Sequence, residues 1–481
     1  MSSRVMALPP VTVKRSHGWR ALWGAAFTVG GLTATAKIAS MFKDSLVASR
    51  FGNGAELDAF LLSLIVPGFM ISVAAGTLPA ALTPTYIAVR EHEGSSAAHE
   101  IARAVLASLF RWLPLLSVVG AVASLGYAAL PHSQLAPATR ALLPLLAMWL
   151  APYTLLQGMC AAWSGLLAAE RAYAASAMAP IAQPVGITVA LLLGGSANIG
   201  ILVAGLLGGT LVQSLILARA LQQRGLPILA WRTSASATPA SRAAMTRVRA
   251  QYVPAVAAAV LMSSTLLVDQ TMAAWLPSGS VSALGFGTKL SAVMMSVGAI
   301  ALSTTLLPHL SELVAREEWS ELRKLERRVA MVILAATIPA TVSLIFFSEP
   351  IVRVLFERGA FTASETATVA RVQSSYMLQL PVHLLGILYV RIISALQANR
   401  LLTIGSAINV TVNIALNFVF MQWIGVAGIA LSTAAVYAVS CVFLSVAARR
   451  VLREAERASA NGAAAKVVTA SNQEESCASA A

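Results

Sequence analysis

Charged side chains stand inside long apolar runs of this sequence, and these are the residues that could do chemistry. Lys37, Lys43 and Asp44 share one such run. Lys289 and Arg391 lie in two others. A charge at the centre of a membrane helix costs about 2.5–3.5 kcal/mol, so such side chains are expected to line a wet cavity or to pair with acids. A cavity rich in cations suits an anionic group such as a pyrophosphate.

A structural interpretation of the same charges stays open. Lys43 and Asp44 could lie near a membrane surface and extend to water. Ion pairs, for example between Asp269 and Lys289, could neutralise the others without any ligand. Lys37 and Asp44 are seven residues apart and share a helical face, whereas Lys43 is rotated from that face. The spacing alone therefore does not decide between a binding cavity and a set of structural pairs.

A second polar set lies late in the chain. Asn409, Asn413 and Asn417 follow one another at four-residue steps and so share a helical face. Asparagines in membrane helices more often bond neighbouring helices. The alternative is that Asn413 and Asn417, with Asp269 and Thr433, offer oxygen ligands to a small hard cation such as sodium. The sequence leaves open whether sodium, a proton or the membrane potential would drive a transport cycle.

The composition places these charges in a membrane protein. Of 481 residues, 57% are hydrophobic and 11% are charged, and the mean hydropathy is +0.75. A soluble domain carries about 25% charged residues. Backbone groups in lipid must be satisfied internally, and no segment sustains the two-residue alternation of a barrel, so an all-α polytopic fold is predicted. The sequence contains no GxxxxGK[ST] phosphate loop and no cysteine–histidine metal spacing, which argues against an enzyme with a cofactor.

About twelve segments are long and apolar enough to span a bilayer, which needs about 20 residues each. Basic residues lie mostly in alternate short loops, so the +14 net charge indicates membrane orientation and not a nucleic-acid partner. This bias places both termini in the cytoplasm. The predicted spans are centred near Val29, Val73, Val118, Pro152, Val185, Gly208, Met262, Val297, Thr337, Leu384, Val412 and Val436.

The spans fall into two halves that repeat. Leu82-Thr-Pro84 parallels Leu306-Leu-Pro308, and the stretch 167–171 parallels 396–400 at nearly the same separation. Six spans in each half give a parallel repeat, and substrate sites in such transporters lie between the halves. The residues after Pro239 are expected to form a short amphipathic helix on the membrane surface. The predicted units are a cytoplasmic N-terminal segment (1–20), two six-helix bundles (21–221 and 251–450), a basic linker (222–250) and a disordered cytoplasmic tail (451–481).

Four stretches of the chain match the motifs of a known family. The first two are AKIASMFKDSLVASRFGNGAELDAF (36–60) and LPSGSVSALGFGTKL (276–290), the latter followed by TTLLPHLSE (304–312). The others are LFERGAFT (355–362) and Arg391 with its downstream asparagine pair. Over about residues 21–447 the chain resembles MurJ/MviN-type lipid-linked precursor flippases of the multidrug/oligosaccharidyl-lipid/polysaccharide exporter superfamily.

The resemblance implies a V-shaped pair of six-helix bundles that alternates access and moves an undecaprenyl-pyrophosphate-linked glycan to the outer leaflet. The chain departs from the family where a double arginine on the second helix is replaced by the stretch 66–72, VPGFMIS. Two extra C-terminal helices of the peptidoglycan flippases are also missing from the pattern. An exopolysaccharide precursor is therefore as good a candidate as lipid II. By position, Lys37, Lys43 and Lys289 look like replacements for the family's cavity arginines, and Asp44, Asp58 and Arg391 resemble its pattern directly.

We therefore predict a monomeric inner-membrane flippase with polymer-synthesis enzymes as candidate partners. Its expected substrate-binding residues are Lys37, Lys43, Asp44, Asp58, Lys289 and Arg391. One alternative is a cation-coupled multidrug antiporter of the same superfamily, whose cavity should be dominated by acids and aromatic residues. Another is a non-transporting membrane partner of a polymer-synthesis complex, which would tolerate neutral side chains in place of the deep lysines.

Overall fold

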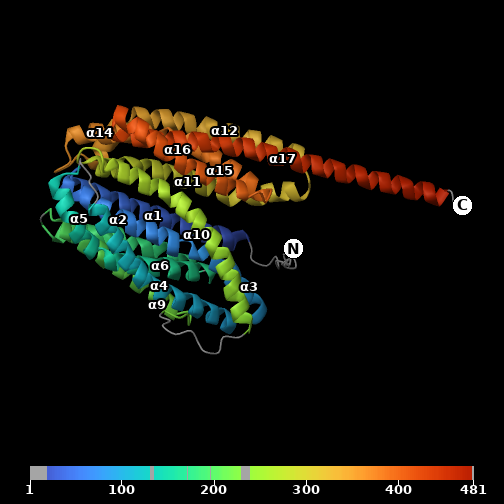
Figure 1. The fold of residues 1–481 in the computed structure, drawn as a ribbon, viewed down its shortest axis with the longest axis horizontal. Helices are drawn as coiled ribbons and strands as arrows, with labels where there is room; N and C mark the ends of the chain where they lie inside the picture. Colours follow the sequence, from blue (N-terminus) through green and yellow to red (C-terminus); the bar gives the residue numbers. More distant parts are fainter. Residues whose placement is uncertain (1–18, 130–134, 171, 196, 229–238, 479–481) are drawn as a thin grey trace.

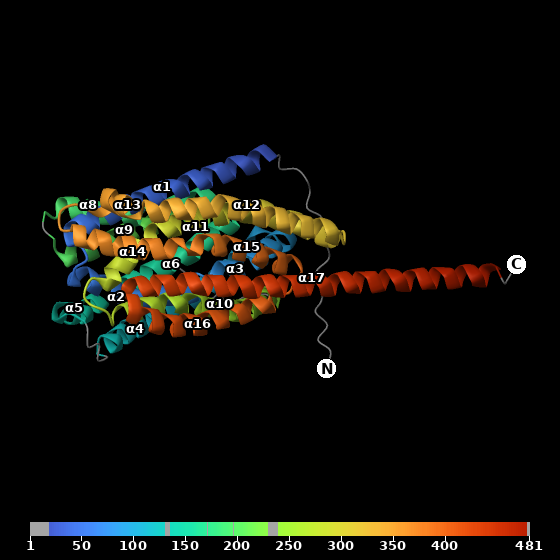
Figure 2. The same ribbon diagram turned by 90° about the horizontal axis from the view of Figure 1, so that it is seen from above.

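The computed structural model describes residues 19–129, 135–170, 172–195, 197–228 and 239–478, and all regular elements in these ranges are helices. Figure 1 shows them gathered into two elongated bundles that lie side by side, and Figure 2 shows the same helices from above, where the bundles overlap. Helices satisfy their backbone hydrogen bonds within one segment, as a chain of this hydropathy requires in lipid. The predicted all-α fold in two bundles is confirmed.

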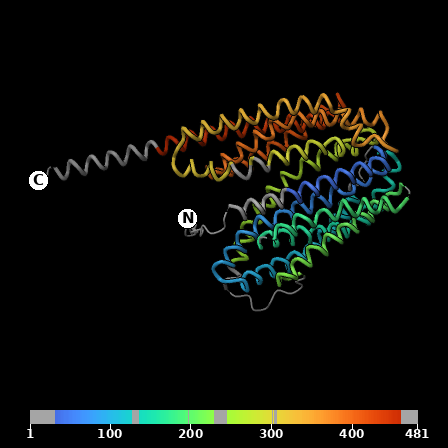
Figure 3. The backbone as a smooth tube through the Cα atoms, turned by 180° about the vertical axis from the view of Figure 1, so that it is seen from behind, coloured from blue at the N-terminus to red at the C-terminus, as the bar shows by residue number. Residues whose placement is uncertain are grey.

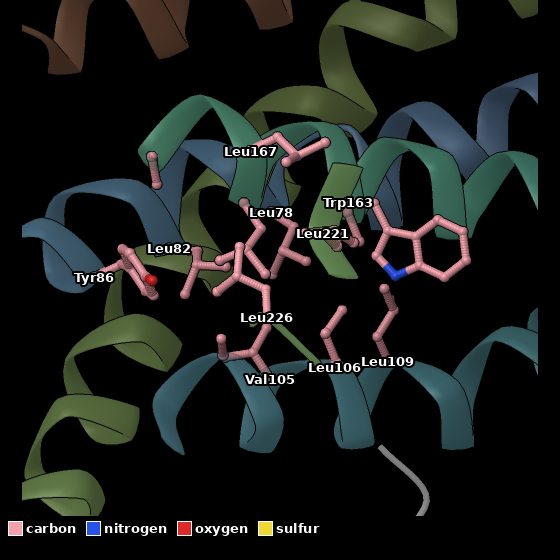
Figure 4. Close-up of a cluster of buried hydrophobic side chains, with 14 of the residues drawn as sticks. Leu78, Leu82, Tyr86, Val105, Leu106, Leu109, Trp163, Leu167, Leu221 and Leu226 are labelled. Carbon is pink, nitrogen blue, oxygen red and sulfur yellow. The ribbon is translucent and has the colours of Figure 1, made fainter. Parts of the chain in front are cut away.

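The first bundle is built from the N-terminal half of the chain. Its core at one end contains aliphatic and aromatic side chains of α3, α4, α6 and α9, among them Tyr86 and Trp163 (Figure 4). A π-helix, η1 (Ile71–Ala75), follows α2, and a short 3-10 helix, η2 (Ala179–Ile181), precedes α8. The helices are α1 (Trp19–Phe51), α2 (Ala55–Met70), α3 (Leu78–Glu93), α4 (Ser95–Ala129), α5 (Pro137–Trp149), α6 (Ala151–Ala169), α7 (Tyr173–Met178), α8 (Ala182–Leu193) and α9 (Ile199–Gln222).

The second bundle is built from the C-terminal half. Buried leucines and isoleucines of α11, α12, α15 and α17 form its core. Its helices are α10 (Pro239–Ala273), α11 (Ser280–Ala315), α12 (Trp319–Phe346), α13 (Ser348–Phe356), α14 (Ala363–Met377), α15 (Gln379–Ala395), α16 (Arg400–Ile424) and α17 (Val426–Ala478).

Most of the predicted spans correspond to helices that could cross a membrane. Within the described residues, ten helical segments are long and apolar enough, and the pair α5–α6, bent by 50°, makes eleven. The helix α1 contains Lys37, Lys43 and Asp44 within its apolar sequence. The first predicted span therefore coincides with a long helix that has charged residues along its later turns.

Apart from the contacts of α10, the two bundles meet at one end. Figures 1 and 3 show that they converge where α5 and α14 lie and diverge toward the end from which α17 projects. At the convergent end, which we call the joined end, one apolar core contains side chains of both halves, including Val47 and Phe60 with Phe286 and Phe356. The V shape implied by the motifs is thus visible in the fold.

The helix α10 packs on both bundles. Ala244 and Val248, near its start, are buried in the core of the first bundle. The Tyr252 hydroxyl donates to the carbonyl of Ala74 in η1 at 2.6 Å, while the later turns of α10 pack on α16. Proline is well tolerated in the first turn of a helix, so Pro239 begins α10. The expectation of a short separate amphipathic helix after Pro239 is wrong.

The helix α17 continues to Ala478, through the tail that the sequence led us to expect as disordered. Figure 1 shows this extension projecting beyond both bundles. The segment after residue 451 is rich in alanine, glutamate and arginine, which have high intrinsic helix propensity. Local propensity therefore favours helical structure in this stretch.

Candidate functional site

Three glycine turns meet at the joined end, and each comes from one of the motif stretches. Gly52, Gly279 and Gly359 have φ angles of +56°, +91° and +60°. A Cβ atom at Gly359 would lie 2.3 Å from the carbonyl oxygen of Ser49, and one at Gly279 would lie 2.6 Å from that of Asn53. Only glycine satisfies both the backbone conformation and this close approach of the two halves.

Hydrogen bonds across the same interface fasten the two halves. The amide of Ala360 donates to the carbonyl of Ser49 at 2.8 Å. The amide of Asn53 donates to the Glu365 carboxylate at 2.5 Å. In addition, the Ser45 hydroxyl donates to a backbone carbonyl of α13 at 2.5 Å. The end of α1 is therefore held directly by the loop between α13 and α14.

Asp58, which we predicted to bind substrate, lies in this interface. Its Oδ2 accepts from the amide of Gly279 at 2.6 Å and its Oδ1 from that of Ser282 at 2.8 Å. The first amides of a helix lack partners within the helix and carry partial positive charge. Asp58 of the first half thus caps α11 of the second, and Asp58 is only 3% exposed. We call the contacts of Gly52, Asp58, Gly279 and Gly359 the latch.

Next to the latch, two lysines share one carboxylate. Asp44 pairs with Lys43 of the same helix and with Lys289 of α11, whose Nζ lies 3.0 Å from Asp44 Oδ2. The Asp44 side chain is 6% exposed, so it does not extend to water. Lys289 therefore pairs with Asp44 and not with Asp269. We call Lys43, Asp44 and Lys289 the triad; two cations against one anion leave it a net positive charge at the bundle interface.

The triad lines a small cavity with otherwise mostly apolar walls. The cavity measures about 80 Å³, and its walls include Phe60, Ile187 and Phe286. Pockets that enclose small molecules measure about 300–1,000 Å³. The cavity in this conformation has room for water or a small anion but not for a glycan, so a bulky substrate requires the bundles to separate.

Two predicted binding residues lie away from the cavity. Lys37 is six residues before Lys43 on α1, which corresponds to about 9 Å along the helix, and its side chain is exposed. Arg391 is half-buried on α15. Among the described residues, the walls of the cavity include neither of them. The structure therefore brings together Lys43, Asp44 and Lys289 and leaves these two cations nearer the diverging end.

The four residues of the candidate cation site come together as the sequence suggested. Asp269 of α10 accepts from the side-chain amides of Asn413 and Asn417 at 2.9 and 2.7 Å, both from α16. The Thr433 hydroxyl of α17 donates to the other oxygen at 3.1 Å. Asp269 is 5% exposed and forms no ion pair within the described part of the chain. A buried carboxylate with only neutral neighbours is a place that a cation or a proton would stabilise.

Sequence reasoning missed Gly359 and Glu365, although both lie in or beside the third motif. Glu365 closes a capping box at the start of α14 with Thr362, and its carboxylate also accepts from the Asn53 amide. The pattern Thr-x-x-Glu predicts such a cap from sequence. Its contact with the other half follows only from how the bundles meet.

Two helical bundles, with a cationic triad between them and a latch at one end, are the architecture of a membrane transporter and not of an enzyme. Within this class, the chain belongs to the lipid II flippase MurJ family, whose family profile matches residues 47–472. The chain is a multi-pass membrane protein.

Curated relatives agree with this assignment, and solved structures share the fold. A probable lipid II flippase MurJ of Rhizobium meliloti (strain 1021) is 27% identical over 421 residues, covering 84% of this chain and 76% of the relative. A structure of the lipid II flippase MurJ in an inward closed conformation matches with a TM-score of 0.73 at 19% identity, covering 89% of both chains. An inward-facing multidrug resistance MATE family transporter of the MOP superfamily matches with a TM-score of 0.70 at 12% identity, covering 88% and 96%. At such identities the structures show a shared fold alone.

Proposed function

We propose that this chain flips an undecaprenyl-pyrophosphate-linked glycan across the bacterial inner membrane by alternating access, working as a monomer with both termini in the cytoplasm. The observation that carries the proposal is the triad, in which lysines of opposite bundles share one carboxylate. The names of its relatives favour lipid II as the glycan carrier. A precursor of another surface polymer is the second candidate within this class, and polymer-synthesis enzymes are the candidate partners.

The proposed binding step is an exchange of anions. A lysine ammonium is a compact charge with three donors, and it suits phosphate oxygens. A diphosphate carries more negative charge than the single Asp44 carboxylate, so it competes for Lys43 and Lys289. When Lys289 leaves Asp44, a charge contact between the halves is lost. Substrate binding would in this way favour separation of the bundles.

In this conformation the latch closes the joined end of the transporter. Because the joined end is closed and the cavity is small, the glycan must enter from the diverging end. Release on the other side of the membrane then requires the latch contacts to break. In the proposed alternating-access cycle, the diverging end closes while the joined end opens.

A cation-coupled multidrug antiporter is supported less well. A cavity for cationic drugs needs a net negative charge to attract its ligand. The cavity of this chain contains two lysines and one aspartate. Its charge therefore favours an anionic ligand, although the fold is shared with drug transporters.

The proposal is tested with purified protein in vesicles that contain a labelled lipid. Lipid II and an undecaprenyl-pyrophosphate-linked oligosaccharide are compared, and translocation is measured by access of an external probe to the headgroup. Faster movement of lipid II than of the oligosaccharide supports lipid II as the substrate, and the reverse supports another polymer. Failure to move either lipid contradicts the proposal.

We further propose that Asp269 and its three donors couple transport to a monovalent cation or a proton. Bundle rearrangement would change the spacing between α10, α16 and α17, and with it the stability of the buried charge. Coupling free energies of this kind are typically about 1–3 kcal/mol, or about 5- to 150-fold in affinity. Sodium and proton remain distinct candidates, and they are separated by imposing each gradient alone.

Replacing Asp269 with asparagine is expected to lower the gradient-driven translocation rate by about 5- to 150-fold, because the substitution keeps the shape but removes the charge. Translocation is measured with a sodium gradient and, separately, with a pH gradient. Asn409→Ala is the matched control, since Asn409 lies on the same face of α16 but bonds Ser440. A D269N protein that still responds to both gradients would exclude this site from coupling.

A further inference from the structure

A basic cleft lies between α12 and α17 at the diverging end, opposite the latch. Its volume is about 300 Å³, larger than that of the triad cavity. No residue of the triad, the latch or the Asp269 cluster contributes to it. The cleft is lined by Arg323, Glu326 and Arg327 of α12 and by Arg449, Leu452 and Arg453 of α17.

The cleft has more positive than negative charge. Arg323 forms two hydrogen bonds of 2.7 Å with the Glu456 carboxylate. The Nε of Arg449 lies 3.6 Å from the buried Glu326 carboxylate. Within the described residues, the other two arginines of the cleft form no ion pair. Two arginines are thus neutralised and two remain to attract an anion.

The position of the cleft along α12 and α17 indicates which kind of anion lies near it. On α12, the charged turns end at Arg328 and a mainly apolar sequence runs from Val329 to Phe346. On α17, an apolar sequence ends at Ala448 and the charged turns begin with Arg449. Cationic residues at the ends of membrane helices lie at the level of lipid headgroups. The cleft therefore opens where headgroup phosphates are concentrated.

Exposed apolar side chains continue the cleft toward the membrane interior. Met331 lies one turn from Arg327 on α12 and is 64% exposed. Val446 and Val442 lie one and two turns from Arg449 on α17 and are 62% and 64% exposed. Residues at these spacings share a helical face. Each helix thus presents arginine at the headgroup level and apolar surface directly beneath it.

We propose that the basic cleft binds the phosphate of an anionic membrane phospholipid, with its acyl chains along the apolar faces of α12 and α17. Arginine is the side chain best suited to phosphate, because its planar group donates two parallel hydrogen bonds. Basic pockets between membrane helices suit anionic headgroups. A free phosphate would satisfy the arginines but would leave the adjoining apolar faces unused. A lipid bound there would connect the first turns of α12 to α17 at the base of the second bundle.

The proposal is tested by binding of short-chain phosphatidylglycerol to the purified full chain, with phosphatidylcholine and inorganic phosphate as parallel probes. The double variant R327Q/R453Q removes the two unpaired cleft arginines. The control R328Q/R450Q removes the same number of charges at arginines outside the cleft lining, one residue after Arg327 on α12 and three residues before Arg453 on α17. We expect the cleft variant to bind phosphatidylglycerol at least about tenfold more weakly, because each basic residue near the membrane surface contributes to the binding free energy of an anionic lipid. We expect the control to bind phosphatidylglycerol as tightly as the unaltered chain does.

Equal loss in both variants would overturn the proposal, since it would reflect net charge alone. Inorganic phosphate that binds the cleft as tightly as phosphatidylglycerol would also overturn it, as would displacement of phosphatidylglycerol by an undecaprenyl-pyrophosphate lipid, which would assign the cleft to the transported lipid. The midpoint of thermal unfolding without lipid shows whether each variant folds. If the cleft double variant unfolds, the single substitutions R327Q and R453Q are compared in the same titration.

Discussion

Replacing Gly359 with alanine is expected to reduce translocation to less than about a tenth of its normal rate. A left-handed conformation costs an alanine about 1–2 kcal/mol, and the added Cβ atom would lie 2.3 Å from the Ser49 carbonyl oxygen. Relief requires the end of α1 to move away from the loop between α13 and α14. The conformation in which the joined end is closed would thus become a minor state, and its low population would limit the rate of the transport cycle. The rate is measured in vesicles with labelled lipid II.

The matched control is Gly225→Ala. Gly225 has a φ of +66°, close to that of Gly359, but no atom lies within 4 Å of the position of its Cβ. It therefore carries the same backbone strain without the close approach. Similar losses in both variants would show that strain alone is responsible and would contradict the role of the latch.

Replacing Lys289 with glutamine is expected to weaken binding of lipid II and to slow its translocation by about 10- to 100-fold. Hydrogen bonds to charged groups contribute about 1.5–3 kcal/mol, and each 1.4 kcal/mol corresponds to a factor of ten. Glutamine keeps the approximate length of the side chain but removes the charge. Lys289→Arg keeps the charge and should retain most of the activity. Binding is measured with lipid II in detergent, and translocation in vesicles.

The control for this substitution is Lys324→Gln. Lys324 is an exposed lysine of α12 whose only ion pair within the described chain is with Glu321 on its own helix. A K289Q protein with unchanged lipid II binding would exclude the triad as the diphosphate site. Such a result would leave the role of the latch untouched, because Lys289 makes none of its contacts.

The sequence predicts the helices well, because apolar runs in lipid have no alternative to helical structure. The two bundles follow from the repeat and from the charges of the loops. The position of α10 does not follow, since a basic segment after a proline reads as a linker, while Ala244 and Val248 pack into the first bundle. Helical structure in the tail was also missed, because low apolar content says nothing about helix propensity.

The candidate site was predicted in its residue types but not in its pairing. Lys43, Asp44 and Lys289 were identified because charges in apolar runs are costly, yet which lysine meets which acid depends on the contact between bundles. Asp58 was expected to face substrate, because sequence does not show that two backbone amides of α11 satisfy it. The cluster around Asp269 was easier to find, since Asn413 and Asn417 lie one helical turn apart.

The position of α10 also affects how the protein can be assembled during synthesis. The core of the first bundle includes Ala244 and Val248, which lie beyond the segment that joins the two halves. Asp269, on the same helix, is needed by Asn413 and Asn417 of the second bundle. The first bundle cannot therefore complete its core until the seventh spanning segment has left the ribosome. For the same reason, no single cut of the chain would yield two fragments that each retain a whole bundle.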